Sequence, residues 1–216
     1  YGLVGSEMCI RDRFWMQVMT GTLYGLGVGP GDPELITLKA YRLLLASPVL
    51  AYPAPETGDS LARRIVAPHL NGNKTEVAIR MPLSAPSFPD ESVYGAAAST
   101  LGKHLATGQD VAVLCEGDPF FYGSFMYLFA RLAKQHTVEV VPGVSSPMAC
   151  SAVLGAPLAA QNDILTILPA TLETQLLKER LVTCDAAAII KIGRHLPRIR
   201  DTVSYTHLTL PTKAYV

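Results

Sequence analysis

Short apolar runs alternate with longer segments in which apolar residues recur every three or four positions. The short runs have the length of buried strands, and the longer segments have helical spacing. Such an alternation predicts an α/β protein with a largely parallel sheet, helices on its faces and a ligand site beyond the carboxyl ends of the strands. The expected strands are 22–28, 48–52, 76–80, 110–115 and 138–141, and the expected helices between them are 33–46, 60–70 and 91–107.

The start of the first helix is marked by Asp32 and Pro33. Aspartate is a favoured N-cap residue, and proline is tolerated at the first helical position because its missing N–H has no intrahelical partner there. Leu35, Leu38 and Leu45 then follow at helical spacings. We therefore expect a helix from residue 33 to about Ala46.

A second unit begins after Pro157, where the alternation starts again with a strand at 163–168, a helix at 172–183 and a strand at 186–192. This pattern predicts an N-terminal domain at 19–158 and a partial C-terminal domain at 159–202. The second unit is below the size at which one core usually sustains itself. We expect it to be truncated at its C-terminal side.

Both ends of the chain break the pattern of the rest. Residues 1–18 and 203–216 show no helical or strand periodicity, and Met19 is a natural start. Both stretches resemble translated sequencing-adapter sequence. We therefore expect a non-native leader and a non-native tail.

Charge and composition limit the classes of molecule that the protein is expected to bind. The 216 residues are 49% hydrophobic, and 18 basic residues balance 18 acidic ones. Without a basic patch, no surface for nucleic acid or for an anionic membrane is indicated, and no apolar run reaches the roughly 20 residues that cross a bilayer. We expect a small-molecule partner.

The four cysteines form no CxxC pair, and three of them lie in apolar stretches where a free thiol is usually buried, so a cytoplasmic location is expected. The histidines His69, His104 and His136 have no partner at metal-ligand spacing. No metal is expected.

The glycine-rich loop "GLGVGPGDPELIT" at 25–37 is not a dinucleotide site. A GxGxxG pattern would need glycine at Pro30 or Asp32, and no acidic residue follows about 20 positions later. A P-loop would need a lysine followed by serine or threonine. The loop is either a structural turn or a segment whose backbone approaches another kind of ligand.

A second loop, "VLCEGDPFFYGSF" at 113–125, places Glu116 and Asp118 between an apolar strand and three aromatic residues. Together with "GVGPGDPELITLKA" (27–40) and "VEVVPGVSS" (138–146), in this order and spacing, it resembles the tetrapyrrole methylases, which use S-adenosylmethionine. The resemblance covers residues 20–201. It implies two α/β lobes with the cofactor in the cleft between them, a fold unrelated to Rossmann methyltransferases, and a homodimer.

Within that family, Glu116 and the runs "FFYGSFMYL" (120–128) and "IIKIGRHLP" (189–197) resemble the branch that methylates C-20 of precorrin-2 to give precorrin-3A in cobalamin biosynthesis. Enzymes that act on the cobalt-containing equivalent share these motifs. Other members of the superfamily are the alternatives within the enzyme class. Glu116 and the aromatic run count against uroporphyrinogen-III methyltransferase, and the neutral charge without a basic patch counts against diphthine synthase and a ribose methylase of ribosomal RNA. A cofactor-binding fragment without activity is the non-enzymatic alternative.

The resemblance also implies the cofactor contacts. Carboxylates and aromatic faces can offset the charge of a sulfonium in a dry pocket. Phe125 and Tyr127 are more simply core residues, and Ser145 and Ser146 are open to a second interpretation as N-caps of the following helix. The residues that match family cofactor positions are Pro30, Glu116, Gly117, Asp118, Phe121, Ser145, Ser146 and Ile192.

Three residues are candidates for a catalytic base: Asp32, Glu116 and Tyr122. Asp32 has the alternative role of an N-cap. A tetrapyrrole substrate carries many carboxylates, so cationic side chains should surround the cleft. The candidates for that role are Arg80, Lys191, Arg194 and His195, each with the alternative of being a solvated surface charge.

Overall fold

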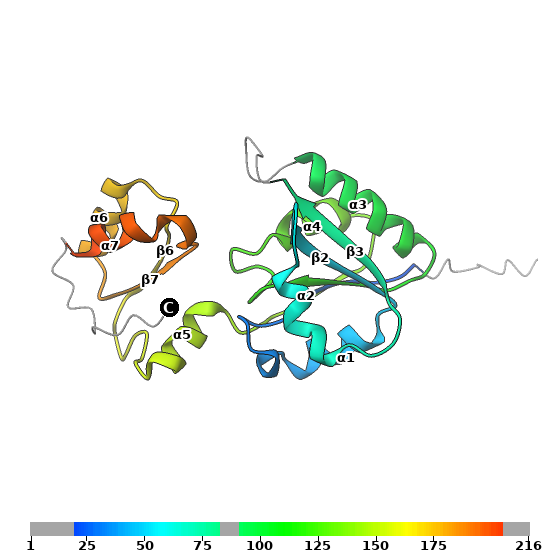
Figure 1. Cartoon of the computed structure of the whole chain (residues 1–216), viewed down its shortest axis with the longest axis horizontal. Coiled ribbons are helices and arrows are strands. Elements are labelled where there is room, and N and C mark those ends of the chain that lie inside the picture. Colours follow the sequence, from blue (N-terminus) through cyan, green and yellow to red (C-terminus); the bar gives the residue numbers. More distant parts are fainter. Residues whose placement is uncertain (1–19, 83–90, 205–216) are drawn as a thin grey trace, which may run out of the picture.

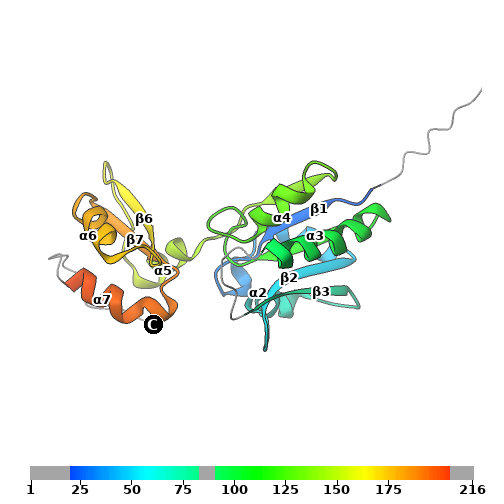
Figure 2. The same ribbon diagram turned by 90° about the horizontal axis from the view of Figure 1, so that it is seen from above.

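The computed structural model describes residues 20–82 and 91–204 and shows two α/β lobes joined by helix α5 (Ser146–Leu154) (Figure 1). The expected leader 1–18 and nearly all of the expected tail lie outside the described residues. In both views the two lobes lie at opposite ends of the molecule with α5 between them (Figure 2). The predicted fold class of two α/β lobes is confirmed.

The first lobe is built on a five-stranded, fully parallel sheet of order β3-β2-β4-β1-β5. Each strand that the hydrophobic pattern predicts here is present. The bounds are β1 Leu23–Gly27, β2 Val49–Pro55, β3 Thr75–Met81, β4 Val111–Cys115 and β5 Val138–Val141.

Helices cover both faces of this sheet, as expected for parallel strands. On one face, α3 (Glu91–Ala106) and α4 (Phe125–Leu132) pack on the sheet, and on the other face α1 (Leu38–Ala46) and α2 (Leu61–Val66) do so. Every residue of β4 is buried, which is typical of a central parallel strand. The alternation of its side chains sends Val113 into one core and Leu114 into the other.

The directions of the chain after β1 and after β4 indicate where a ligand would bind. These strands are neighbours, yet the chain after β1 crosses β4 to reach β2, while the chain after β4 crosses β1 to reach β5. Adjacent strands whose connections leave in opposite directions open a crevice at their carboxyl ends, which is where open α/β sheets bind ligands. The loops after β1 and β4 are the two motif loops of the sequence.

The predicted helix at 33–46 is wrong in one respect, because it is two elements. Asp32 caps only a 3₁₀ turn at Pro33–Leu35, accepting the Glu34 N–H at 2.9 Å. The backbone is then extended at Ile36 and Thr37, and the Thr37 hydroxyl oxygen accepts the Ala40 N–H at 3.3 Å to start α1. A second cap residue thus starts a new helix. The predicted helix 60–70 likewise ends early, since α2 stops at Val66 and a 3₁₀ turn at Ala67–His69 contains Pro68.

The second lobe is a parallel pair, β6 (Leu165–Pro169) and β7 (Ala186–Ile190), with α6 (Thr174–Val182) and α7 (Leu196–Ser204). Its small core consists of Leu168, Ala170, Leu177, Leu181, Ile199 and Val203. Helix α7 was not expected from the sequence. It continues past the boundary at 202, and Val203, the first residue of the expected tail, is buried in it with 6% exposure.

Candidate functional site

Three loops lie in contact at the carboxyl ends of β1, β4 and β5. Glycines at the points of contact let their backbones approach one another closely. The Gly117 N–H donates to the Gly29 carbonyl at 2.8 Å, which joins the first two loops. A Cβ on Gly143 would lie 2.1 Å from the Gly117 carbonyl oxygen, and one on Gly27 would lie 2.5 Å from the Gly143 nitrogen. The backbones therefore approach at distances that a side chain would prevent.

Asp118 ties two of these loops together. Its Oδ1 accepts the N–H groups of Phe120 at 2.9 Å and Phe121 at 3.1 Å, and its Oδ2 accepts the Gly143 N–H at 3.0 Å. With three backbone donors, this carboxylate fixes the β4 loop and holds the β5 loop against it. Asp118 thus has a structural role in addition to lining the site.

Two of the cavities beside these loops have residues of the second lobe in their lining. The first, here called the glycine-loop cavity, has a volume of about 240 Å³. The second, the aromatic cavity, has a volume of about 340 Å³ and is lined by Pro53, Met81, Tyr94, Cys115, Glu116, Phe121, Tyr122, Gly123, Ser124 and Lys191. Four residues line both cavities: Glu116, Phe121, Tyr122 and Lys191. The two cavities therefore adjoin.

The glycine-loop cavity gathers seven of the eight residues that the family resemblance assigns to the cofactor. Its lining consists of Pro30, Leu61, Glu116, Gly117, Asp118, Phe121, Tyr122, Ser145, Ser146, Ile190 and Lys191. The eighth, Ile192, does not line it. The Ile192 side chain packs on the core of the second lobe, and Ile190 and Lys191 line the cavity from β7 instead.

Glu116 follows β4 directly and lines both cavities. Although its side chain is exposed to the cleft, the surrounding protein displaces enough water to raise its pKa, and a hydrogen bond from the Ala62 backbone N–H opposes part of that rise. The net direction is upward. In such a setting, a cation that enters the cavity would stabilise the ionised form of the carboxylate.

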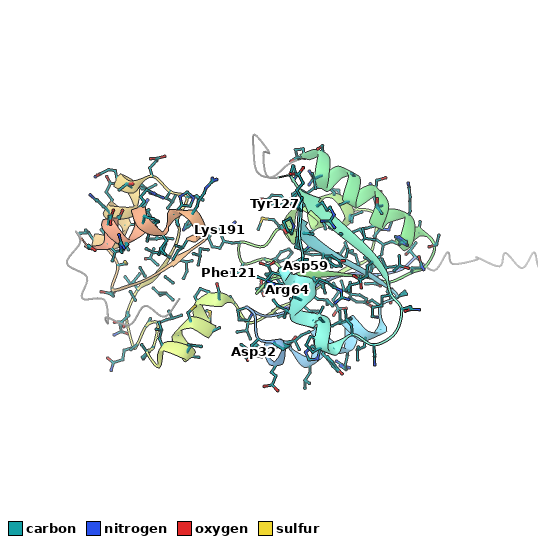
Figure 3. All side chains as sticks on the ribbon, in the orientation of Figure 1. Asp32, Asp59, Arg64, Phe121, Tyr127 and Lys191 are labelled. Carbon is teal, nitrogen blue, oxygen red and sulfur yellow. The ribbon has the colours of Figure 1, made fainter. Side chains whose placement is uncertain are left out.

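Tyr122 and Lys191 both have left-handed backbones, with φ of 56° and 57°. Bulky residues rarely adopt this conformation, and backbone strain of this kind is concentrated at functional sites. The two residues come from different lobes and line both cavities. Lys191 and Phe121 both lie where the two lobes face each other (Figure 3).

The serines after β5 do not cap helix α5 with their side chains. Ser145 occupies the N-cap position with 8% exposure, but its hydroxyl makes no capping bond and instead donates to Met148 Sδ at 2.8 Å. Ser146 is exposed. The capping interpretation of these hydroxyls is therefore wrong, and both side chains line the glycine-loop cavity.

Four other candidates lie outside the two cavities. Asp32 is exposed and caps the 3₁₀ turn, and Arg194 and His195 belong to a 3₁₀ turn at Gly193–His195. None of these three lines the glycine-loop or the aromatic cavity. Arg80 lines a separate cavity between β2, β3 and α2. The structure therefore places none of the four in the lining of the glycine-loop or the aromatic cavity.

Part of the aromatic cavity is formed by residues that no sequence pattern marks. Tyr94, on α3, lines it with 1% exposure, and its hydroxyl has no hydrogen-bond partner of good geometry among the described residues. Pro53 and Met81 come from the ends of β2 and β3, and Ser124 precedes α4. Phe125, at 1% exposure, is the core residue that was expected, and Tyr127 packs against the same core.

The cysteines differ from one another in their surroundings. Cys115 is buried as expected, and burial raises the pKa of its thiol far above the usual range. Cys150 on α5 is exposed, contrary to the expectation from its apolar neighbours, because α5 bridges the lobes and only its Pro147 is buried. No helix in the described ranges is both long and apolar enough to cross a bilayer.

Comparison with known proteins shows which family and which proteins the chain is similar to. The family model described as tetrapyrrole (corrin/porphyrin) methylases matches residues 22–212. A precorrin-2 C(20)-methyltransferase of Sinorhizobium sp. is 41% identical over 87% of this chain and 80% of that protein. A cobalt-precorrin-2 C(20)-methyltransferase of Salmonella typhimurium is 33% identical over 88% of this chain and 81% of that protein.

Other matches concern a longer protein and a solved structure. The cobalamin biosynthesis protein CobIJ of Mycobacterium tuberculosis is 40% identical over 87% of this chain, which spans only 39% of that protein. A uroporphyrin-III C-methyl transferase from Thermus thermophilus, solved with S-adenosyl homocysteine, has a TM-score of 0.61 and 26% identity. This likeness covers 85% of this chain and 76% of the Thermus chain.

Proposed function

The chain belongs to the tetrapyrrole methylase family, and on that premise we propose that it transfers a methyl group from S-adenosylmethionine to C-20 of precorrin-2. The product is precorrin-3A, an intermediate of cobalamin biosynthesis. The observation that carries the proposal is the pair of adjoining cavities at the switch point, which share Glu116, Phe121, Tyr122 and Lys191.

The glycine-loop cavity is the proposed cofactor site. Its lining brings together Pro30, Gly117 and Ser145 from three strand-end loops, all of them residues at family cofactor positions. Backbone groups and hydroxyls of these loops offer partners to the polar parts of the cofactor. Glu116 and the ring of Phe121 lie where they can offset the sulfonium charge. A relative crystallised with S-adenosyl homocysteine supports this assignment.

The aromatic cavity is the proposed site of the reacting part of the tetrapyrrole. Rings of Tyr94, Phe121 and Tyr122 suit a flat, conjugated substrate, and the cavity opens onto the cofactor side at Glu116. The methyl donor and the methyl acceptor then lie in adjoining cavities, which meet at the residues that line both of them, here called the shared wall. Alignment of sulfur, methyl and carbon is the main contribution, because in well-oriented reactions it supplies roughly 7–11 kcal/mol.

Proton removal is assigned to the residues at the shared wall. The bridge carbon attacks the methyl group, the electrons of the broken C–S bond stay on sulfur, and S-adenosylhomocysteine and one proton leave. Glu116 and Tyr122 line both cavities and are the proposed acceptors or electrostatic partners. Asp32 is not retained for this role, because it lines neither cavity and caps a turn.

Lys191 is the proposed cationic contact to a substrate carboxylate. It reaches the shared wall from the second lobe, and its left-handed backbone is set by the turn that follows β7. An ammonium group there forms a charge-assisted hydrogen bond to an acetate or propionate group of the tetrapyrrole. Arg194 and His195, which lie outside both cavities, are left out of this proposal.

The metal-free substrate is favoured over its cobalt-containing equivalent. Identity is 41% to the relative named for precorrin-2 and 33% to the one named for cobalt-precorrin-2. Because the chain spans 39% of CobIJ, no other activity of that longer protein is carried over. A cytoplasmic location, expected from the cysteines, and a homodimer, implied by the family resemblance, complete the proposal. Light scattering on the purified protein tests the dimer.

A methyl-transfer assay tests the proposal. The protein is incubated with labelled S-adenosylmethionine and, separately, with precorrin-2, its cobalt complex or uroporphyrinogen III, and the products are identified by mass spectrometry. We expect single methylation of precorrin-2 at the highest rate. Faster methylation of the cobalt complex or of uroporphyrinogen III would reassign the substrate, and no transfer to any of them would support an inactive cofactor-binding fragment.

A further inference from the structure

A third cavity in the first lobe has an unusual concentration of guanidinium groups. It has a volume of about 170 Å³ and lies between the ends of β2 and β3 and the start of α2. Its lining residues, which define what is here called the arginine cavity, are Tyr52, Ala54, Gly58, Asp59, Ser60, Arg63, Arg64, Ala67 and Arg80. Figure 3 shows Arg64 and Asp59 on this part of the lobe.

One of the three arginines is already neutralised. Arg63 Nη2 lies 2.9 Å from Glu76 Oε1, and Arg63 Nε donates to both Glu76 oxygens at 3.1 and 3.0 Å. The Tyr52 hydroxyl donates to the same carboxylate at 2.8 Å. This hydrogen-bonded group builds one wall of the cavity and holds the Arg63 side chain in place.

The other two arginines keep their charge. Arg80 Nη1 donates to the backbone carbonyls of Pro55 at 3.1 Å and Glu56 at 3.4 Å, which orient the guanidinium but carry no negative charge. The Arg64 side chain is exposed and makes no hydrogen bond or ion pair within the described ranges 20–82 and 91–204. Among the described residues that line this cavity, Asp59 is the one carboxylate. Apart from the Arg63–Glu76 pair, two cations face one anion.

The arginine cavity lies at the same end of the sheet as the two cavities of the proposed methyl-transfer site. Ser60 lines the arginine cavity, and the next residue, Leu61 at the start of α2, lines the glycine-loop cavity. At the ends of β2 and β3, Pro53 and Met81 line the aromatic cavity, whereas Ala54 and Arg80 line the arginine cavity. Because successive side chains of a strand point to opposite faces of a sheet, the arginine cavity lies on the α2 side and the aromatic cavity on the α3 side, and the two are neighbours across the ends of β2 and β3.

We propose that the arginine cavity binds a carboxylate side chain of the tetrapyrrole, with Arg64 and Arg80 as its ligands. The inference rests on the proposed function, because it takes the bound tetrapyrrole as the source of the carboxylate. Guanidinium groups present paired N–H donors that match the two oxygens of a carboxylate. The subsite fixes the orientation of the macrocycle and so determines which bridge carbon faces the cofactor.

The experiment compares Arg64→Gln, and Arg64→Gln combined with Arg80→Gln, with the parent protein. Arg64→Gln breaks no hydrogen bond or ion pair within the described residues, so it preserves the fold. Arg42→Gln on α1 is the matched control, since Arg42 is an exposed arginine that lines none of the three cavities. Binding of precorrin-2 is measured by absorbance titration, and binding of S-adenosylhomocysteine by calorimetry.

We expect at least a tenfold weaker dissociation constant for precorrin-2 in the double variant, a smaller loss in Arg64→Gln, and unchanged binding of S-adenosylhomocysteine. The control should match the parent. Unchanged precorrin-2 affinity in the double variant would overturn the proposal. Inorganic phosphate is titrated as well, and phosphate binding that depends on these arginines while precorrin-2 binding does not would also overturn it.

The outcome separates this subsite from the proposed activity. If precorrin-2 binding depends on Arg64 and Arg80 but the parent transfers no methyl group, the subsite stands and the proposed function fails. If the parent methylates precorrin-2 with an affinity that these arginines do not affect, the function stands and the subsite fails.

Discussion

Glu116 and Lys191 line the same two cavities from opposite lobes of the protein. Glu116 follows the central strand β4, and Lys191 follows β7 with a left-handed backbone. One anionic and one cationic side chain therefore lie at the shared wall between the proposed cofactor and substrate sites. A cationic donor and a polycarboxylate acceptor are the ligands that such a pair of charges would hold.

Replacing Glu116 by Gln tests the need for the negative charge. The amide keeps the shape and still accepts the Ala62 N–H, so a loss of rate reports the charge. We expect single-turnover methyl transfer to fall at least tenfold, which is about 1.4 kcal/mol in the barrier. Glu173→Gln, at an exposed position before α6, is the control. A Glu116→Gln rate equal to the parent would show that the carboxylate is not needed.

The pH dependence of the reaction should reflect the ionisation of Glu116. Burial raises the Glu116 pKa, so the carboxylate ionises at a higher pH than an ordinary glutamate. Because the ionised form is the active one in our account, kcat/KM should rise as the pH rises through this raised pKa, and Glu116→Gln should lack that rise. An identical profile in the variant would assign the titration to another group.

The stability of the unliganded protein should change with pH in the opposite direction. A raised pKa means that the folded state binds this proton more tightly than the unfolded state does. The contribution of Glu116 to the free energy of unfolding is therefore present below the ordinary glutamate pKa and is lost as the pH rises through the raised one. Urea unfolding of the parent and Glu116→Gln across this range measures the difference.

Gly117→Val should abolish cofactor binding. Gly117 has φ of 65° and lines the glycine-loop cavity, and a Cβ there would lie 3.6 Å from the Ser145 Cα, so the valine methyl groups would fill space beside the cofactor. Gly72→Val is the matched control, because Gly72 has φ of 81° with nothing within 4 Å of an added Cβ. Both variants carry backbone strain, but only the first should lose calorimetric binding of S-adenosylhomocysteine. Equal binding by both would remove Gly117 from the site.

Asp118→Asn should loosen the junction of the β4 and β5 loops. The amide oxygen can replace Oδ1, but an NH₂ group cannot accept the Gly143 N–H. The expected loss in the free energy of unfolding is about 1–3 kcal/mol. In the control Asp110→Asn, the single bond from the Thr22 N–H to Oδ1 can be kept, so less stability should be lost. Equal losses in the two variants would contradict the structural role of Asp118.

Much of the fold could be predicted because each strand of the first lobe is a short apolar run bounded by turn residues. The positions of Pro30, Gly117 and Ser145 in one cavity could be predicted as well, since family motifs at successive strand ends meet wherever a parallel sheet has a switch point. The family resemblance therefore points to seven of the residues that line the glycine-loop cavity, whereas Leu61, Tyr122, Ile190 and Lys191 line it without being assigned to the cofactor by that resemblance.

What could not be predicted depends on contacts between distant segments. Tyr94 reaches the aromatic cavity from the middle of the chain, and nothing near it in sequence marks that role. The family resemblance implies a cofactor contact through the backbone of Ile192, and the structure adds that its side chain packs on the core of the second lobe directly after the left-handed residue Lys191. Helix α7 has few apolar positions, and its Arg198 is fixed by the carbonyl of Leu172, a contact that periodicity does not reveal.

Transfer of the methyl group to one particular carbon of the substrate defines the proposed activity. The most direct measurement is the carbon NMR spectrum of the product formed from precorrin-2 and S-adenosylmethionine labelled with carbon-13 in its methyl group. Our account predicts one enriched methyl signal, which is split by one-bond coupling when the precorrin-2 also carries carbon-13 at C-20. Enrichment at a pyrrole ring carbon or at another bridge carbon would contradict it.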